Sequence, residues 1–220
     1  MQPTLFDEQR IKRLLSIHIR KSGWKRSDAL VPEYFVERAS RRADLVAVNG
    51  HLHAYEIKSD LDHLSRLPGQ IETYSRYFEL VTVVCTERHL SAVIDQTEAH
   101  IGVLCVSADG FAEHRRAAKR KLTDVDVWLS HLPIAAIRVA LSTRGIRCPR
   151  VGRKDVLDVA RVNLSVDDAR SAVLSYLKNE KRKQRALLAR TKEKNSSIDP
   201  LSEHRAMLRE YLASRGIAIA

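Results

Sequence analysis

The stretch "RADLVAVNGHLHAYEIKSD", residues 42–60, decides the fold, because it holds two apolar runs on either side of Asn49-Gly50. Asn-Gly is the dipeptide most typical of a two-residue turn between antiparallel strands. Such a turn places Asp44 within one residue of Glu56 across the two strands. The stretch is therefore predicted to be a β-hairpin whose open end carries charged side chains.

The charged residues of the second strand suggest a chemical role. Glu56 and Lys58 lie two residues apart, so their side chains share one face of a strand that is otherwise apolar. Two carboxylates held close together, here Asp44 and Glu56, repel each other unless a cation lies between them. Mg²⁺ prefers one or two carboxylates and leaves its other positions to water and phosphate. With Lys58 to orient a bound water, the pattern predicts a Mg²⁺ or Mn²⁺ centre that hydrolyses phosphodiesters.

Apolar spacing along the rest of the chain predicts alternating helices and strands. A helix is expected over residues 5–21 and a strand over 30–37. After the hairpin, the expected order is a helix over 60–80, a strand over 81–85, a helix over 91–100 and a strand over 102–107.

Single helices between strands imply parallel pairing by right-handed crossovers. We therefore expect an α/β fold: a three-layer α/β/α core with a mixed sheet in residues 1–120. From about residue 121 only helical patterns occur, and residues 121–220 are expected to form a basic helical region, with Ser165 as the N-cap of its longest helix.

The bulk composition excludes several protein classes. With 44% hydrophobic and 30% charged residues in a chain of 220, it is typical of a folded globular protein. Its longest apolar runs are much shorter than the ~20 residues of a membrane-spanning helix, and the start lacks the pattern of an export signal. Cys85, Cys105 and Cys148 are odd in number and widely spaced, which fits neither a disulfide framework nor a zinc motif. We expect a cytoplasmic protein with no membrane partner.

The positive charge is concentrated in the C-terminal part of the chain. Residues 138–220 hold 19 Lys or Arg against 9 Asp or Glu, which accounts for most of the net charge of +11. Such an excess favours DNA phosphates as partners, although a solvated helix face would have the same composition. Two basic runs supply the candidate nucleic-acid-binding residues, which are Arg115, Arg116, Lys119 and Arg120, and Lys181, Arg182, Lys183 and Arg185.

The order Asp44, then Glu56-Ile57-Lys58, resembles the D…E-x-K core of the PD-(D/E)XK nuclease superfamily. Over roughly residues 30–90 the chain is also similar to a bacterial and prophage-borne group of uncharacterised nuclease-like proteins, which share the signature R-x-D…N-G…EIKSD…Q-x-x-x-Y. The Q-x-x-x-Y part resembles that of RecB-type nucleases. This resemblance implies a restriction-endonuclease-like core.

The resemblance also implies the metal ligands. Asp44 and Glu56 would supply carboxylates and Ile57 its carbonyl oxygen. Many members of the superfamily add an acid before the aspartate, which here is Glu33 or Glu37. Glu33 is preferred, because its distance from Asp44 along the chain fits the usual spacing better.

Three further residues receive roles from the resemblance. Lys58 would position the attacking water, and Gln70 and Tyr74, one helical turn apart, would lie beside the site. Ala43 stands where the superfamily usually has proline, a departure that leaves the metal chemistry unchanged. Each of these residues also has a structural interpretation, as a surface ion pair or a packed, hydrogen-bonded pair.

Together these features predict a Mg²⁺- or Mn²⁺-dependent deoxyribonuclease, which would act as a monomer or as a homodimer able to cut both strands. An alternative is a catalytically silent module of the same fold that binds DNA or a partner protein in regulation or phage defence. Cleavage of RNA is a third hypothesis. The sequence leaves open endo- or exonuclease action, strandedness and the biological pathway.

Overall fold

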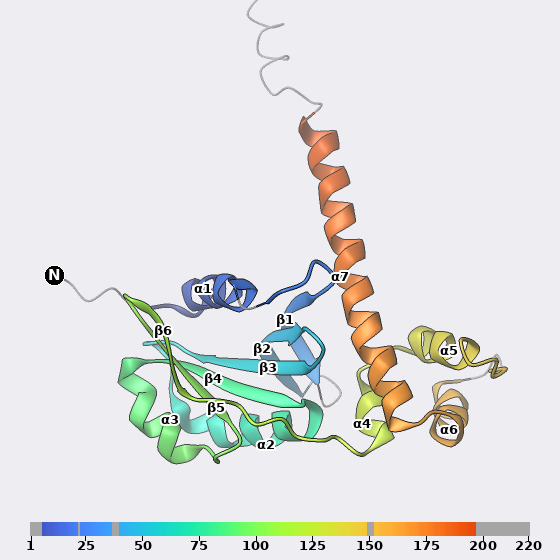
Figure 1. The fold of residues 1–220 in the computed structure, drawn as a ribbon, viewed down its shortest axis with the longest axis horizontal. Coiled ribbons are helices and arrows are strands. Elements are labelled where there is room, and N and C mark those ends of the chain that lie inside the picture. The colour runs from blue at the N-terminus through green and yellow to red at the C-terminus, as the bar shows by residue number, and fades with distance from the viewer. Residues whose placement is uncertain (1–5, 22, 37–39, 149–151, 197–220) are drawn as a thin grey trace, which may run out of the picture. The chain divides into compact units, whose positions relative to one another are not determined.

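A computed structural model describes residues 6–21, 23–36, 40–148 and 152–196, with the side chains of 185 and 187–196 excepted. Its centre is a six-stranded sheet with the strand order β1-β2-β3-β4-β5-β6 (Figure 1). The strands are β1 (Ala29–Val36), β2 (Arg41–Val48), β3 (Leu52–Lys58), β4 (Leu80–Thr86), β5 (Gly102–Ser107) and β6 (Gly110–Arg115). β1, β2 and β3 form an antiparallel meander, β3, β4 and β5 are parallel, and β6 returns antiparallel to β5.

Helices connect and flank these strands. The helices are α1 (Glu8–Lys21), α2 (Leu67–Tyr77), α3 (Leu90–Gln96), α4 (Val125–Ser130), α5 (Ile134–Ser142), α6 (Arg153–Asn163) and α7 (Val166–Ser196), with 3₁₀ turns η2 (Leu64–Arg66) and η3 (Glu87–His89) before α2 and α3. The mixed sheet with helices on both faces confirms the predicted α/β fold. The edge strand β6 was not predicted, because its mostly exposed, polar sequence has no apolar run.

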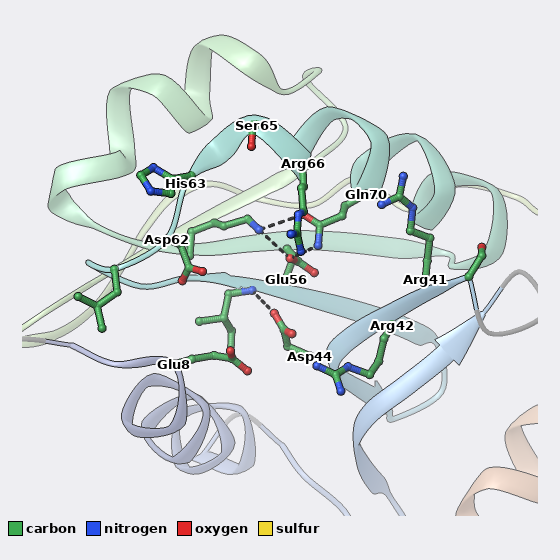
Figure 2. A pocket seen from close by; sticks show the side chains of 14 residues that line it. Glu8, Arg41, Arg42, Asp44, Glu56, Asp62, His63, Ser65, Arg66 and Gln70 are labelled. Atoms are coloured by element: carbon green, nitrogen blue, oxygen red, sulfur yellow. Dashed lines mark hydrogen bonds and ion pairs between the residues drawn. The ribbon is translucent and has the colours of Figure 1, made fainter.

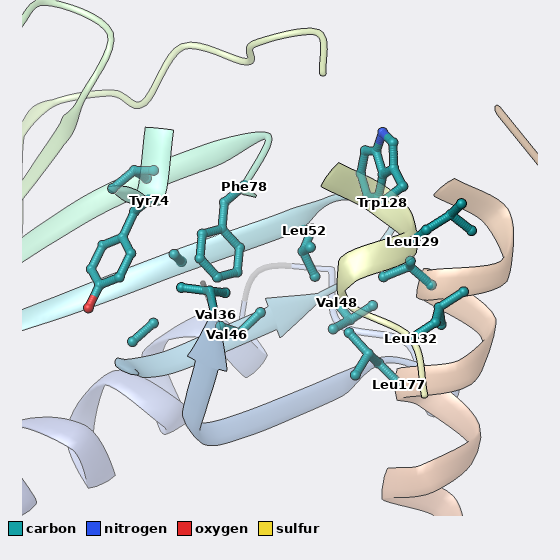
Figure 3. Close-up of a cluster of buried hydrophobic side chains, with 14 of the residues drawn as sticks. Val36, Val46, Val48, Leu52, Tyr74, Phe78, Trp128, Leu129, Leu132 and Leu177 are labelled. Carbon is teal, nitrogen blue, oxygen red and sulfur yellow. The ribbon is translucent and has the colours of Figure 1, made fainter. Parts of the chain in front are cut away.

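The two faces of the sheet carry separate apolar clusters. On one face, Ile11, Leu15 and Ile19 of α1 pack against strand residues such as Leu45. The opposite face is covered by α2 and α3, and by the later helices (Figures 1 and 3). The sheet is therefore buried on both sides, and charged side chains within it are removed from bulk water.

The hairpin register differs from the prediction by one residue. Val48 pairs with Leu52, so the connection has three residues, and Gly50 within it adopts a φ of 102° that favours glycine. The β2–β3 ladder ends at the pair Leu45–Tyr55. Continued by one residue, this register places Asp44 directly opposite Glu56.

The helices after residue 120 belong to the same core as the sheet. Trp128, Leu129 and Leu177 lie in one buried cluster with Val46 and Phe78 (Figure 3). The first compact unit accordingly runs to Lys181, and a second unit begins at Arg182, which differs from the predicted boundary at residue 120.

The start of α7 follows the predicted capping. The Asp168 backbone N–H donates to Ser165 Oγ at 3.1 Å, and the Ser165 N–H donates to Asp168 Oδ2 at 3.1 Å. This reciprocal pair satisfies donors that the first helical turn leaves free. Within the described ranges, no helix combines the length and apolar character needed to cross a lipid bilayer.

Candidate nuclease-like site

The site lies where β2 and β3 separate at the end of their ladder. Here the Ile57 backbone N–H donates to Asp44 Oδ2 at 2.7 Å, so a carboxylate takes the place of a backbone acceptor. A cavity of about 490 Å³ opens at this point. It is lined by side chains that include Glu8, Arg41, Arg42, Asp44, Glu56, Lys58, Asp62, Arg66 and Gln70 (Figure 2).

Glu56 is the centre of a buried hydrogen-bond network. It continues the alternation of Leu52 and Ala54 on the sheet face that α2 covers, so side chains of α2 can reach it. Its side chain is 3% exposed, and Oε1 lies 2.9 Å from Lys58 Nζ. The burial and the ion pair distinguish this E-x-K from a solvated surface pair.

Two residues of α2 complete the network. Gln70 (Figure 2) donates through Nε2 to Glu56 Oε1 at 2.5 Å and accepts from Lys58 Nζ at 2.9 Å. The Tyr74 hydroxyl lies 3.0 Å from Glu56 Oε2 and 2.8 Å from the carbonyl oxygen of Arg42. The structure therefore brings Asp44, Glu56, Lys58, Gln70 and Tyr74 together, as the sequence pattern predicts.

Burial makes ionisation of the two acids unfavourable. Desolvation, followed by the nearby charge of Glu56, raises the pKa of Asp44 to about 7. Desolvation also raises the pKa of Glu56, against the opposing effects of Lys58, Tyr74 and Gln70. Lys58 forms its ion pair with Glu56, and Lys12 is the lysine whose charge lowers the pKa of Asp44. A cation bound between the two carboxylates would favour their ionised forms.

The position of Glu33, the acid predicted as a further metal ligand, is the main difference between the predicted site and the structure. Glu33 lies opposite Asp44 in the β1–β2 register, but its φ of 53° interrupts the pairing. Its carboxylate forms ion pairs with Lys12 and with Arg42, whose Nε lies 2.7 Å away. Glu33 does not line the cavity. Glu37 lies outside the described residues.

Glu8, at the start of α1, lines the cavity instead. The segment before α1 is attached to the loop that follows Lys58: Phe6 N–H donates to Asp60 Oδ2 at 2.9 Å, and Asp60 N–H donates to the Phe6 carbonyl at 3.2 Å. The negative charge of Glu8 also contributes to the raised pKa of Asp44, after burial and Glu56. The sequence does not predict Glu8 as a site residue, because nothing near it in the chain shows that the first turn of α1 lies at this cavity.

The donor set fits a Mg²⁺ ion with few protein ligands. Among the described residues there is no group of three or more His, Cys, Asp or Glu side chains placed to hold a metal. Mg²⁺ commonly binds one or two carboxylates and retains several waters. Asp44 and Glu56, with the carbonyl oxygen of Ile57, meet that smaller requirement.

The predicted basic runs do not line this cavity. Arg115 donates to the Ile101 carbonyl at 2.7 Å, and Arg120 donates to the Ser75 carbonyl at 3.3 Å. Lys119 lies 3.5 Å from the buried carboxylate of Glu79. These three side chains thus have partners within the fold, whereas the neighbouring Arg116 is exposed.

The second basic run lies on α7 across the boundary between the two compact units. Arg182 and Lys183 are exposed and Lys181 is half-buried, while the side chain of Arg185 lies outside the described residues. The arginines that do line the cavity are Arg41, Arg42 and Arg66. Arg42 falls on the first position of the shared signature, but nothing in the sequence assigns Arg42 or Arg66 to the site.

A family model and a curated relative give the same family for this chain. Protein cII of Enterobacteria phage P4 is 31% identical over 179 residues, which cover 80% of this chain and 68% of that protein. Among solved structures, a protein of unknown function from Silicibacter pomeroyi is 21% identical with a TM-score of 0.44, over 66% of this chain and 92% of that one. Residues 1–205 match the family described as Bacteriophage P4 protein cII. The chain therefore belongs to the bacteriophage P4 protein cII family.

Proposed function

We propose that this protein is a Mg²⁺- or Mn²⁺-dependent deoxyribonuclease of the PD-(D/E)XK type. The observation that carries the proposal is the buried cluster of Asp44, Glu56 and Lys58 at an open cavity, where Asp44 accepts the backbone N–H of Ile57 beside Glu56. Burying two acids is costly unless the site has a use for a cation. Cys85 and Cys105 are free, buried thiols, which suits a reducing cytoplasm.

The side chains have distinct roles in this proposal. Asp44, Glu56 and the carbonyl oxygen of Ile57 would hold the ion. When bound, the ion would polarise a phosphoryl oxygen and lower the pKa of a water molecule. Lys58 holds a positive charge beside the cavity, which stabilises negative charge that develops on a phosphate. Gln70 fixes the ammonium of Lys58 through the 2.9 Å hydrogen bond.

One observation favours a second candidate function. Both oxygens of Glu56 already have partners, with Lys58 and Gln70 at Oε1 and Tyr74 at Oε2. A carboxylate satisfied in this way would suit a catalytically silent module that binds DNA or a partner protein. The exposed Arg116, Arg182 and Lys183 could contact DNA phosphates under either function.

Incubation with defined DNA substrates separates the two functions. We expect cleavage of at least one form among linear duplex, nicked, closed circular and single-stranded DNA in Mg²⁺ or Mn²⁺, and none in EDTA. RNA of the same sequence serves as a comparison, since cleavage of RNA alone would point to the third hypothesis. Retained DNA binding, with no cleavage of any form in either metal, would favour the silent module.

Metal binding should also appear as a change in stability. We expect Mg²⁺ or Mn²⁺ to raise the Tm of the parent protein at pH 8, where Asp44 is ionised, and to have much less effect at pH 5, where Asp44 holds a proton. The Asp44→Asn variant should show no metal-dependent shift at either pH. An equal shift in the variant would show that the ion binds elsewhere.

The pH dependence of the metal-free protein tests the raised pKa itself. Since the pKa of Asp44 is about 7 in the fold against an ordinary value of 3.8, the folded state keeps a proton that the unfolded state has released. The contribution of Asp44 to the free energy of unfolding should therefore fall as pH rises from about 4 to about 7. Burial lowers the pKa of His53 to about 3 and of His131 to about 4, which acts in the opposite direction.

The contribution of Asp44 is isolated by comparison with Asp44→Asn, which keeps both histidines. The difference in free energy of unfolding between the two proteins should change by a few kcal/mol, about 1.4 kcal/mol for each unit of pKa shift. Denaturant titrations at several pH values in EDTA measure it. A constant difference across this pH range would show that Asp44 is ionised in the fold.

A further inference from the structure

Two arginines of the cavity lack the acidic partners that other arginines have. Arg76 lies 2.8 Å from Glu72, and Arg161 lies 2.7 Å from Asp126. Arg41 and Arg66 form no ion pair with any described carboxylate, although Glu8, Asp44, Glu56 and Asp62 line the same cavity. Among the described residues, the guanidinium groups of Arg41 and Arg66 thus have no carboxylate within ion-pair distance.

The two arginines reach the cavity from different elements. Arg41 begins β2, and Arg66 ends the 3₁₀ turn η2 just before α2 (Figure 2). A Cβ atom added at Gly69 would lie 3.0 Å from Arg41 Nη2, so the glycine leaves room for this guanidinium. The next residue, Gln70, holds Lys58. The arginines therefore lie beside the turn of α2 that organises the candidate site.

The charged groups of the cavity indicate the kind of ligand. Buried carboxylates together with two guanidinium groups that have no acidic partner suit a cation at the acids and an anion at the arginines. Guanidinium groups match phosphate oxygens well, because they offer several N–H donors in a fixed plane. A nucleic acid strand supplies successive phosphates, so one phosphate at a metal ion held by the acids would be followed by another for the arginines.

We propose that Arg41 and Arg66 form a subsite for the phosphate next to the scissile one on the same strand. This inference rests on the proposed nuclease function for the position of the scissile phosphate. The binding of a phosphate by Arg41 and Arg66 requires no metal, so binding and cleavage can be measured separately.

The test is DNA binding by the full chain in EDTA, where metal-dependent cleavage cannot occur. The probe is a fluorescein-labelled single-stranded 12-mer, and its Kd is measured by anisotropy over a range of KCl concentrations. We expect Arg41→Gln and Arg66→Gln each to raise the Kd several-fold and to reduce the salt slope of log K by about 0.7. Arg76→Gln is the matched control, because it removes the same charge from an exposed residue of α2 outside the cavity and should bind like the parent.

Folding and charge are controlled separately. Because Arg41 and Arg66 make no ion pair with described carboxylates, both variants should melt at the temperature of the parent. Arg66→Lys keeps the charge but loses the planar donor group, so its salt slope should match the parent while its Kd remains raised.

The possible failures are distinguishable. If Arg41→Gln and Arg66→Gln bind like Arg76→Gln, the subsite is overturned, even when the parent cuts DNA and Lys58→Met does not. If the arginine variants bind weakly while the parent cuts no DNA in any metal, the nuclease function fails and Arg41 and Arg66 still form a phosphate site.

Discussion

Replacement of Lys58 by methionine should lower the rate of Mg²⁺-dependent DNA cleavage by about 10²–10³-fold, the usual cost of losing one group that stabilises charge in a transition state. The Lys58 side chain is 6% exposed and lies 2.9 Å from both Glu56 Oε1 and Gln70 Oε1. Methionine keeps the length and apolar body of the side chain, so the substitution removes the ammonium with little change in packing. Single-turnover cleavage with enzyme in excess measures the effect.

The control separates chemistry from folding. Lys58→Met leaves Glu56 buried without its cation, and Glu56→Gln leaves Lys58 without its anion, so each single variant should also lose stability. The double variant Lys58→Met/Glu56→Gln removes both charges and should recover much of the Tm, yet remain inactive. A single variant that cuts DNA within threefold of the parent rate would overturn the assignment of the site.

The hairpin shows how far local sequence determines the site. Alternation and the Asn49-Gly50 dipeptide correctly predict two antiparallel strands with Asp44 and Glu56 at their open end. The register was wrong by one residue, because the dipeptide favours a two-residue turn and the actual loop has three. The ladder ends at Leu45 and Tyr55, and its register, continued by one residue, has no offset between the two acids.

Glu8, the acid that α1 adds to the cavity, could not be predicted from spacing along the chain. The choice between Glu33 and Glu37 relied on distance along the chain to Asp44, whereas Glu8 reaches the cavity through a tertiary contact between Phe6 and Asp60. That contact joins residues 54 apart in sequence. Helical periodicity identifies which face of α1 is apolar, but it does not show which part of the fold lies beside the N-terminus of the helix.

The domain boundary has a similar explanation. The loss of strand patterns near residue 121 marks a change of secondary structure, and it predicts a domain boundary at the same place. The apolar stripes of α4, α6 and the first part of α7 show that these helices pack on something, but only coordinates show that their partner is the sheet. The basic run 115–120 was likewise interpreted from charge alone, although Lys119 is near the buried carboxylate of Glu79.

Glu79 is the second position where a large effect is expected, here on stability. Its side chain is 3% exposed, and its carboxylate lies 3.0 Å from Arg170 Nε, on α7. It also accepts the Leu52 backbone N–H at 2.9 Å, at the start of β3. Arg170 donates in addition to the Gly50 carbonyl in the hairpin loop. The carboxylate therefore ties α7 to the hairpin that carries the candidate site.

We expect Glu79→Ala to reduce the free energy of unfolding by about 3–5 kcal/mol, the usual cost of breaking a buried ion pair from one side. The substitution leaves the Leu52 N–H without its acceptor and the half-buried Arg170 guanidinium without its carboxylate, with the Gly50 carbonyl as a remaining acceptor. For a chain of this size, each 1 kcal/mol lowers Tm by about 2–4 °C. Urea titration and thermal melting, both in EDTA, measure the change.

Glu72→Ala is the matched control, because Glu72 also pairs with an arginine, but both side chains are exposed, at 72% and 58%. Its loss should change the free energy of unfolding by no more than about 0.5 kcal/mol. In the double variant Glu79→Gln/Arg170→Met no unpaired buried charge remains, so part of the lost stability should return. If Glu79→Ala were as mild as Glu72→Ala, the attachment of α7 to the hairpin would depend on apolar packing around Val173 and Leu177 alone, and the buried ion pair would contribute no net stability.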